Sequence, residues 1–194
     1  MQKHFISAQA LLDDAFELAA KVIESGFRPD CIIALWRGGT PVGIAVQELF
    51  EYCGLAVDHI AIRTSLYSGV DQRERRVKVH NLDYIFKNFT TDNKLLIVDD
   101  VFDTGLTLQA VLAEIRNNLR TGQRSDIRTA VPWFKPARNQ TALKPDYYLH
   151  ETDDWLVFPH EICDLGSDEI RAKGGRVSQV VARMDELISR KPSL

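Results

Sequence analysis

Two short apolar runs, each closed by a turn and followed by a helical pattern, most strongly constrain how this chain can fold. Residues 31–36 (CIIALW) end at Gly38 and Gly39, before a helical pattern over residues 41–52. Residues 95–98 (LLIV) end at an acidic, glycine-bearing turn, and the next helix is indicated by apolar residues at Leu108, Val111, Leu112, Ile115 and Leu119. Apolar runs this short are typical of strands buried inside a parallel sheet.

The rest of the chain continues this alternation. An amphipathic helix is predicted from the N-cap candidate Ser7 to a stop at Gly26. Other expected elements are strands over residues 57–63, 127–134 and 147–150, an apolar patch over 155–158, and a closing helix over 177–188. The pattern predicts an α/β fold with a central, mainly parallel sheet flanked by helices. In such folds ligands bind beyond the carboxyl ends of the strands.

Composition limits the classes of protein that fit. The 194 residues, 45% of them hydrophobic, suit a single domain over residues 1–194. A formal net charge of -3, from 24 basic and 27 acidic residues, gives no footprint of a nucleic-acid binder. Three cysteines without a CxxC pair argue against a disulfide framework and a zinc site. Without a signal-peptide core or a run able to span a bilayer, we expect a cytoplasmic protein.

The segment LLIVDDVFDTGLT, residues 95–107, carries the strongest chemical signal. The backbone N–H groups of a TGLT loop that opens a helix can surround a phosphate, together with the hydroxyls of Thr104 and Thr107. Asp99 and Asp100 can accept hydrogen bonds from vicinal hydroxyls or hold Mg²⁺. Asp and Thr are also common helix N-caps, so simple capping is the alternative interpretation.

Residues 98–107 resemble the phosphoribosyl pyrophosphate signature of the type I phosphoribosyltransferases, and the chain is most similar to bacterial xanthine-guanine and archaeal hypoxanthine enzymes. The resemblance implies the fold of that family, with a flexible loop and a small purine-binding hood. It also implies that Asp99 and Asp100 hold the ribose. The 5′-phosphate would lie on Thr104, Gly105, Leu106 and Thr107.

Two further segments support the resemblance. WRGG, residues 36–39, is similar to the family's pyrophosphate loop, in which Arg37, Gly38 and Gly39 would donate to phosphate oxygens; a surface turn is the alternative. The charged segment at about residues 64–80 resembles the lid of the family, with pyrophosphate contacts expected from Arg73, Arg75, Arg76 and Lys78. A solvated loop is the alternative there.

The segments PWFKPARN and DDWLVFPHE, within about residues 133–164, resemble the purine pocket. The resemblance implies that Lys135 donates to the 6-oxo group of the base, Trp155 stacks on the ring, and the backbone near Leu156 binds its edge. A surface lysine and a core tryptophan are the alternatives. His160 stands where relatives often carry an aromatic residue, which leaves the preferred base open.

The reaction implied is transfer of the phosphoribosyl group to N9 of xanthine, guanine or hypoxanthine, with Asp103 exchanging a proton with N7 of the base. Mg²⁺ is the expected cofactor, with Asp100 as its main protein contact and Glu161 as a candidate for a second metal. A homodimer or homotetramer is expected, and Tyr52, Leu66 and Tyr67 lie near segments that relatives use at interfaces. A pyrimidine-specific transferase and a non-catalytic nucleotide-sensing regulator stay open as alternatives.

Overall fold

The apolar run Leu95–Val98 forms strand β5, and all four of its residues are buried. The computed structural model describes residues 3–68, 75–119, 126–163 and 165–189. Strand β5 pairs in parallel with β2 (Cys31–Trp36) on one side and with β7 (Ile127–Phe134) on the other. Burial on both faces explains why these strands are continuously apolar rather than alternating.

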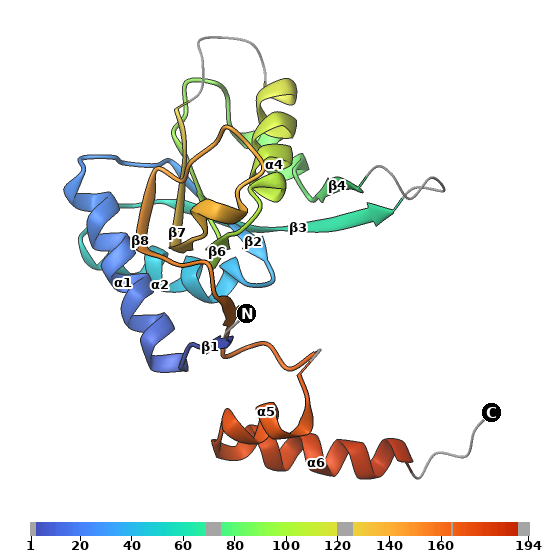
Figure 1. Cartoon of the computed structure of the whole chain (residues 1–194). Coiled ribbons are helices and arrows are strands. Elements are labelled where there is room, and N and C mark those ends of the chain that lie inside the picture. The colour runs from blue at the N-terminus through green and yellow to red at the C-terminus, as the bar shows by residue number, and fades with distance from the viewer. Residues whose placement is uncertain (1–2, 69–74, 120–125, 164, 190–194) are drawn as a thin grey trace. The chain divides into compact units, whose positions relative to one another are not determined.

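The sheet has the strand order β4-β3-β2-β5-β7-β6, and β8 also pairs with β7 (Figure 1). The outer strands are β3 (Asp58–Ser68), β4 (Arg75–His80), β6 (Val101–Phe102) and β8 (Tyr147–Glu151). Pairing is parallel throughout except between β3 and β4, which are antiparallel. The predicted fold class is therefore confirmed in its sheet.

Helices cover both faces of this sheet because successive side chains of a strand point to opposite sides. Ile33 and Leu35 of β2 join a core cluster with α3 (Asp83–Asn88) and α4 (Leu106–Asn118). Ala34 points the other way, toward Gly43 of α2 (Gly39–Tyr52). A Cβ at Gly43 would lie 2.8 Å from the Ala34 Cβ, so glycine permits this close packing of helix on strand.

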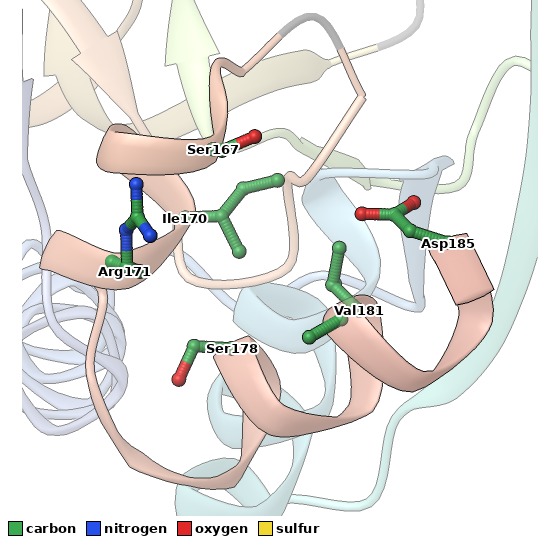
Figure 2. Close-up of a pocket in the computed structure, with 7 residues that line it drawn as sticks. Ser167, Ile170, Arg171, Ser178, Val181 and Asp185 are labelled. Atoms are coloured by element: carbon green, nitrogen blue, oxygen red, sulfur yellow. The ribbon is translucent and has the colours of Figure 1, made fainter.

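The chain divides into two compact units, residues 11–153 and residues 1–10 with 154–194. In the second unit, β1 (Lys3–Phe5) pairs in parallel with β9 (Trp155–Val157), and α5 (Ser167–Ala172) precedes α6 (Gly175–Ser189). Helices α5 and α6 form a pocket of about 290 Å³. Figure 2 shows side chains that line it, among them Ile170 of α5 and Val181 of α6. The expectation of a single domain over residues 1–194 stays a prediction.

Several boundaries differ from the sequence-based expectation. The helix expected at residue 41 begins at Gly39, and the first helix, α1 (Ala8–Glu24), begins after Ser7, whose Oγ accepts from the Ala10 N–H at 3.0 Å as expected of a cap. The strand expected over 57–63 continues to Ser68. Strands β1, β4 and β6 were not predicted, because their sequences, KHF, RRVKVH and VF, lack the apolar run of four or more residues that indicates a buried strand.

Candidate active site

Three of the predicted site segments follow neighbouring strands of the sheet. Arg37 follows β2, Asp99 follows β5, and Lys135 follows β7. These strands are adjacent and parallel, so their carboxyl ends meet at one edge. The sheet order thus places these residues, which are far apart in sequence, at one edge of the sheet. Proteins with an α/β fold bind ligands at this edge.

The glycine loop lies directly against the paired acids. A Cβ built on Gly38 would lie 1.9 Å from Oδ2 of Asp100, and one built on Gly39 would lie 2.5 Å from the Val98 carbonyl oxygen. Neither position has room for a side chain. The glycines therefore let the Trp36–Gly39 backbone approach Asp99 and Asp100, which supports the pyrophosphate-loop interpretation over a surface turn. The peptide bond between Trp36 and Arg37 is cis.

The adjacent carboxylates create an unfavourable concentration of negative charge. Asp100 is only 8% exposed. Burial raises the pKa of Asp99 well above its ordinary value, the negative charge of Asp100 raises it further, and hydrogen bonds from the backbone N–H groups of Asp100 and Gly39 oppose this rise. The Asp100 N–H donates to Oδ1 of Asp99 at 3.0 Å. Such a pair favours a bound cation or hydroxyl donors beside it.

The loop between Asp103 and α4 has the form of an anion site. Gly105 adopts the left-handed conformation with φ +79°, and α4 begins at Leu106. The Leu106 N–H points to Oγ1 of Thr104 at 3.4 Å. Residues 99–105, 107 and 108 line a cavity of about 190 Å³. An open helix N-terminus with threonine hydroxyls around a small cavity suits a phosphate group.

Asp103 does not cap the helix, although capping was the alternative interpretation. The N-cap residue of α4 is Gly105, which has no side chain, and the Leu106 N–H donates to Oγ1 of Thr104 rather than to Asp103. Instead, Oδ1 of Asp103 accepts from Nε of Arg138 at 2.5 Å, and Oδ2 lies 3.7 Å from Nζ of Lys135. Lys135 is 6% exposed, so it is not a surface lysine. The structure thus brings together the acid and the lysine that were predicted from separate motifs.

Arg138 is the residue that sequence reasoning missed. It ends the 3-10 turn η1 (Pro136–Arg138), which follows Lys135 directly. The proline of the PWFKPARN segment indicates a turn after the strand, but it does not indicate which side chain that turn directs toward the site. Without the fold, nothing indicated that Asp103 would lie beside this turn.

The remaining purine-pocket residues belong to the second unit. Trp155 is 51% exposed, which argues against the core-tryptophan alternative, whereas Leu156 is buried. Oε2 of Glu161 accepts from the Phe158 N–H at 3.0 Å, so this carboxylate already closes a turn. Binding of a base by Trp155 and Leu156, and of a second metal by Glu161, stays a prediction.

The expected lid coincides with the antiparallel β3–β4 hairpin. Oγ of Ser65 and Nε2 of His80 lie 3.0 Å apart across it, and Lys78 is paired in register with Ser65. Arg73 and the side chains of Arg75 and Arg76 lie outside the described residues. Their pyrophosphate contacts remain predictions.

The acidic side chains of the site decide whether it suits Mg²⁺. Among the described residues, no group of three or more His, Cys, Asp or Glu side chains is arranged to hold a metal ion. Mg²⁺ commonly takes only one or two protein carboxylates and completes its shell with water and substrate phosphates. Asp99 and Asp100 therefore fit Mg²⁺ that arrives with a phosphorylated substrate, and they do not form a complete cage.

Comparison with known proteins agrees with this geometry. The family model described as phosphoribosyl transferase domain matches residues 2–165. The chain belongs to this family. The predicted type I phosphoribosyltransferase fold and enzyme class are confirmed. The family model covers the glycine loop, the acidic signature and Lys135 alike.

Solved structures of two phosphoribosyltransferases and of one hypothetical protein share the fold. A purine phosphoribosyltransferase from Pyrococcus horikoshii Ot3 is 27% identical, with a TM-score of 0.66 over 86% of this chain and 98% of that one. A xanthine-guanine-hypoxanthine phosphoribosyltransferase from Helicobacter pylori is 19% identical, with a TM-score of 0.62 over 90% of this chain and all of that one (100%). A hypothetical protein from Neisseria gonorrhoeae, solved with bound ppGpp, is 21% identical, with a TM-score of 0.70 over 93% and 97%.

Among curated proteins, the comparison found no match. Within the described part of this phosphoribosyltransferase, none of the helices combines the length and the apolar character needed to cross a membrane.

Proposed function

We propose that this phosphoribosyltransferase transfers the phosphoribosyl group from phosphoribosyl pyrophosphate to N9 of a 6-oxopurine, namely xanthine, guanine or hypoxanthine. The observation that carries the proposal is the 3.7 Å distance between Nζ of Lys135 and Oδ2 of Asp103. On a 6-oxopurine, N7 and the 6-oxo oxygen are neighbours on one edge of the ring. Lys135 supplies a cation for the 6-oxo oxygen, and Asp103 beside it supplies a carboxylate for a proton on N7. Together the two side chains are complementary to that edge.

The other substrate fits the features around this pair. The 5′-phosphate lies on the backbone of Thr104, Gly105, Leu106 and Thr107 in this proposal, where the helix N-terminus supplies N–H donors. The ribose hydroxyls bind Asp99 and Asp100. The pyrophosphate binds Arg37, Gly38 and Gly39, whose backbone lies against the acids.

Asp99 and Asp100 would hold Mg²⁺, with Asp100 as the principal ligand and Asp99 beside it. When bound, Mg²⁺ supplies positive charge that stabilises the departing pyrophosphate. The protein itself positions the reactants, with Arg37 placed to neutralise phosphate charge.

The chemical step exchanges one bond at C1 of the ribose for another. The bond from C1 to the pyrophosphate oxygen breaks, and its electron pair leaves with pyrophosphate. The N9 lone pair of the base forms the new bond to C1. The proton on N7 becomes acidic as N9 bonds, and Oδ2 of Asp103 accepts it as general base. Lys135 holds the 6-oxo group, and Trp155 and Leu156 bind the rest of the base.

The Pyrococcus horikoshii structure supports a purine as the acceptor, because that protein is a purine phosphoribosyltransferase and the chains overlap over most of both lengths. A pyrimidine acceptor is the first alternative. The pair of Asp103 and Lys135 disfavours orotate, because the carboxylate of orotate would lie beside the carboxylate of Asp103. A non-catalytic nucleotide-sensing regulator is the second alternative, and the ppGpp bound to the Neisseria gonorrhoeae protein is the observation that favours it.

The proposal includes assembly into a homodimer or homotetramer through a surface near Tyr52, Leu66 and Tyr67. Tyr52 is exposed.

A base panel tests the proposal. Purified protein with phosphoribosyl pyrophosphate and Mg²⁺ is offered xanthine, guanine, hypoxanthine, adenine, orotate or uracil, and monophosphate formation is measured. We expect product with one or more 6-oxopurines and little with adenine, which presents an amino donor where Lys135 needs an acceptor. A preference for orotate or uracil would establish the first alternative. Binding of ppGpp without product from any base would establish the second.

Lys135→Met tests whether Lys135 binds the base. Loss of a hydrogen bond from a charged donor costs about 1.5–3 kcal/mol, so kcat/KM for the preferred 6-oxopurine should fall roughly 10- to 100-fold. Lys144→Met is the matched control, because Lys144 is an exposed lysine of the same unit that lies over the Phe134 and Tyr148 rings. Equal effects of the two variants would remove Lys135 from the base site.

A further inference from the structure

Arg138 contacts the carboxylate that the proposed reaction uses as its base. Its Nε lies 2.5 Å from Oδ1 of Asp103, while Nζ of Lys135 lies 3.7 Å from Oδ2 of the same side chain. Each carboxylate oxygen therefore faces a different cation. The shorter contact is a charge-assisted hydrogen bond, whereas the longer one is beyond hydrogen-bond length and leaves Oδ2 able to accept a proton.

The backbone that carries Arg138 is fixed to the loop that carries Asp103. The Arg138 N–H donates to the Lys135 carbonyl at 3.2 Å, and the Gln140 N–H donates to the Thr104 carbonyl at 2.9 Å. A Cβ on Gly105 would lie 2.7 Å from Oγ1 of Thr141, so the two segments are in direct contact. The guanidinium thus acts on Asp103 from a defined position.

An aspartate carboxylate turns easily about its last torsion, because that torsion is broad rather than confined to sharp wells. A hydrogen bond to one oxygen removes this freedom. We infer that Arg138 is a positioning residue for proton transfer, holding Oδ1 of Asp103 so that Oδ2 stays turned toward Lys135 and the N7 edge of the base. This inference rests on the proposed function and adds to it a residue that need not touch the substrate.

The same contact contributes little to stability. The side chains of Arg138 and Asp103 are 37% and 35% exposed, and ion pairs open to solvent contribute little to the free energy of folding. Removing the guanidinium should therefore leave a folded protein. We expect its removal to lower kcat instead, since a small misplacement of a reacting group can lower the catalytic rate by as much as about 100-fold.

The test is steady-state kinetics of Arg138→Gln and Arg138→Lys with the preferred base. We expect Arg138→Gln to lower kcat by about tenfold or more while KM for phosphoribosyl pyrophosphate stays unchanged. Arg138→Lys should recover part of kcat, because it retains a cation for Oδ1. Arg116→Gln, which alters an exposed arginine of α4, is the control and should behave as the wild-type enzyme.

A double-mutant cycle separates positioning from a general structural role. If Arg138 acts through Asp103, Arg138→Gln should cause no further loss in an Asp103→Asn background. Losses that multiply, or a wild-type kcat for Arg138→Gln, would overturn the inference while the proposed function stands. A wild-type chain that forms no product from any base would instead overturn the proposed function and this inference with it.

Discussion

At the scale of single residues, the site depends on one carboxylate shared by two cations. Asp103 follows the two-residue strand β6 and lies beside Lys135 and Arg138. Asp103→Asn keeps the size of the side chain and removes its ability to accept a proton. We expect kcat to fall by about 10²–10⁴, the usual contribution of a general base, in an assay of monophosphate formation.

The matched control for this change is Asp92→Asn, which alters an exposed aspartate in the turn before β5. That variant should turn over normally. Near-normal turnover by Asp103→Asn would assign the proton transfer to another group.

At the scale of secondary-structure elements, the glycine loop after β2 must pack against the end of β5. A Cβ at Gly39 would lie 2.5 Å from the Val98 carbonyl oxygen and 2.8 Å from the Asp99 Cα, and backbone atoms cannot rotate away as a side chain can. Gly39→Ala should therefore cost about 1–3 kcal/mol of unfolding free energy, measured by denaturant titration, and should raise KM for phosphoribosyl pyrophosphate.

Gly166→Ala provides the comparison. Its nearest neighbour would be the flexible end of Glu169, with Oε2 at 3.7 Å, so this variant should lose less than about 1 kcal/mol. Similar losses in both variants would show that the contact with β5 is not what makes Gly39 necessary.

At the scale of the whole molecule, the sheet core shields Cys31 at the start of β2. Burial, together with the nearby negative charges of Asp58 and Asp30, raises the pKa of the Cys31 thiol from its ordinary value of 9.0 to about 12. Iodoacetamide at pH 8 should therefore label the native protein at the exposed Cys53 and Cys163 and spare Cys31. Intact mass measurement should give two labels on native protein and three in denaturant.

The same shift has a defined sign in stability. Because the folded-state pKa lies above the unfolded value, the contribution of Cys31 is complete below about pH 9 and is lost as the pH rises through about 12. The free energy of unfolding should fall across that window, and Cys31→Ala should reduce the dependence on pH. Rapid labelling of Cys31 in native protein at pH 8 would contradict the shielding.

Much of the architecture could be predicted from the chain because its signals are local. Continuous apolar residues in 31–36 and 95–98 indicated buried parallel strands, and the helices after them followed from periodicity. Strand β6 and helix α3 were missed because two and six residues carry too little pattern of their own. Strand β3 was predicted only as far as residue 63, and the charged segment that contains β4 was expected as a lid or a solvated loop, because it lacks a clear apolar alternation.

By itself, the sequence indicated phosphoribosyl transfer. The features that indicated it are a strand that ends in paired acids, a helix start that contains glycine, and a lysine after another strand. Those features depend on neighbours along the chain, which is why the motif from Leu95 to Thr107 could be interpreted directly. Only the tertiary structure decided that Asp103 is not a cap and that Arg138 lies against it. That arrangement arises because β6 and β7 pair in register, which brings two residues 35 positions apart to one edge of the sheet.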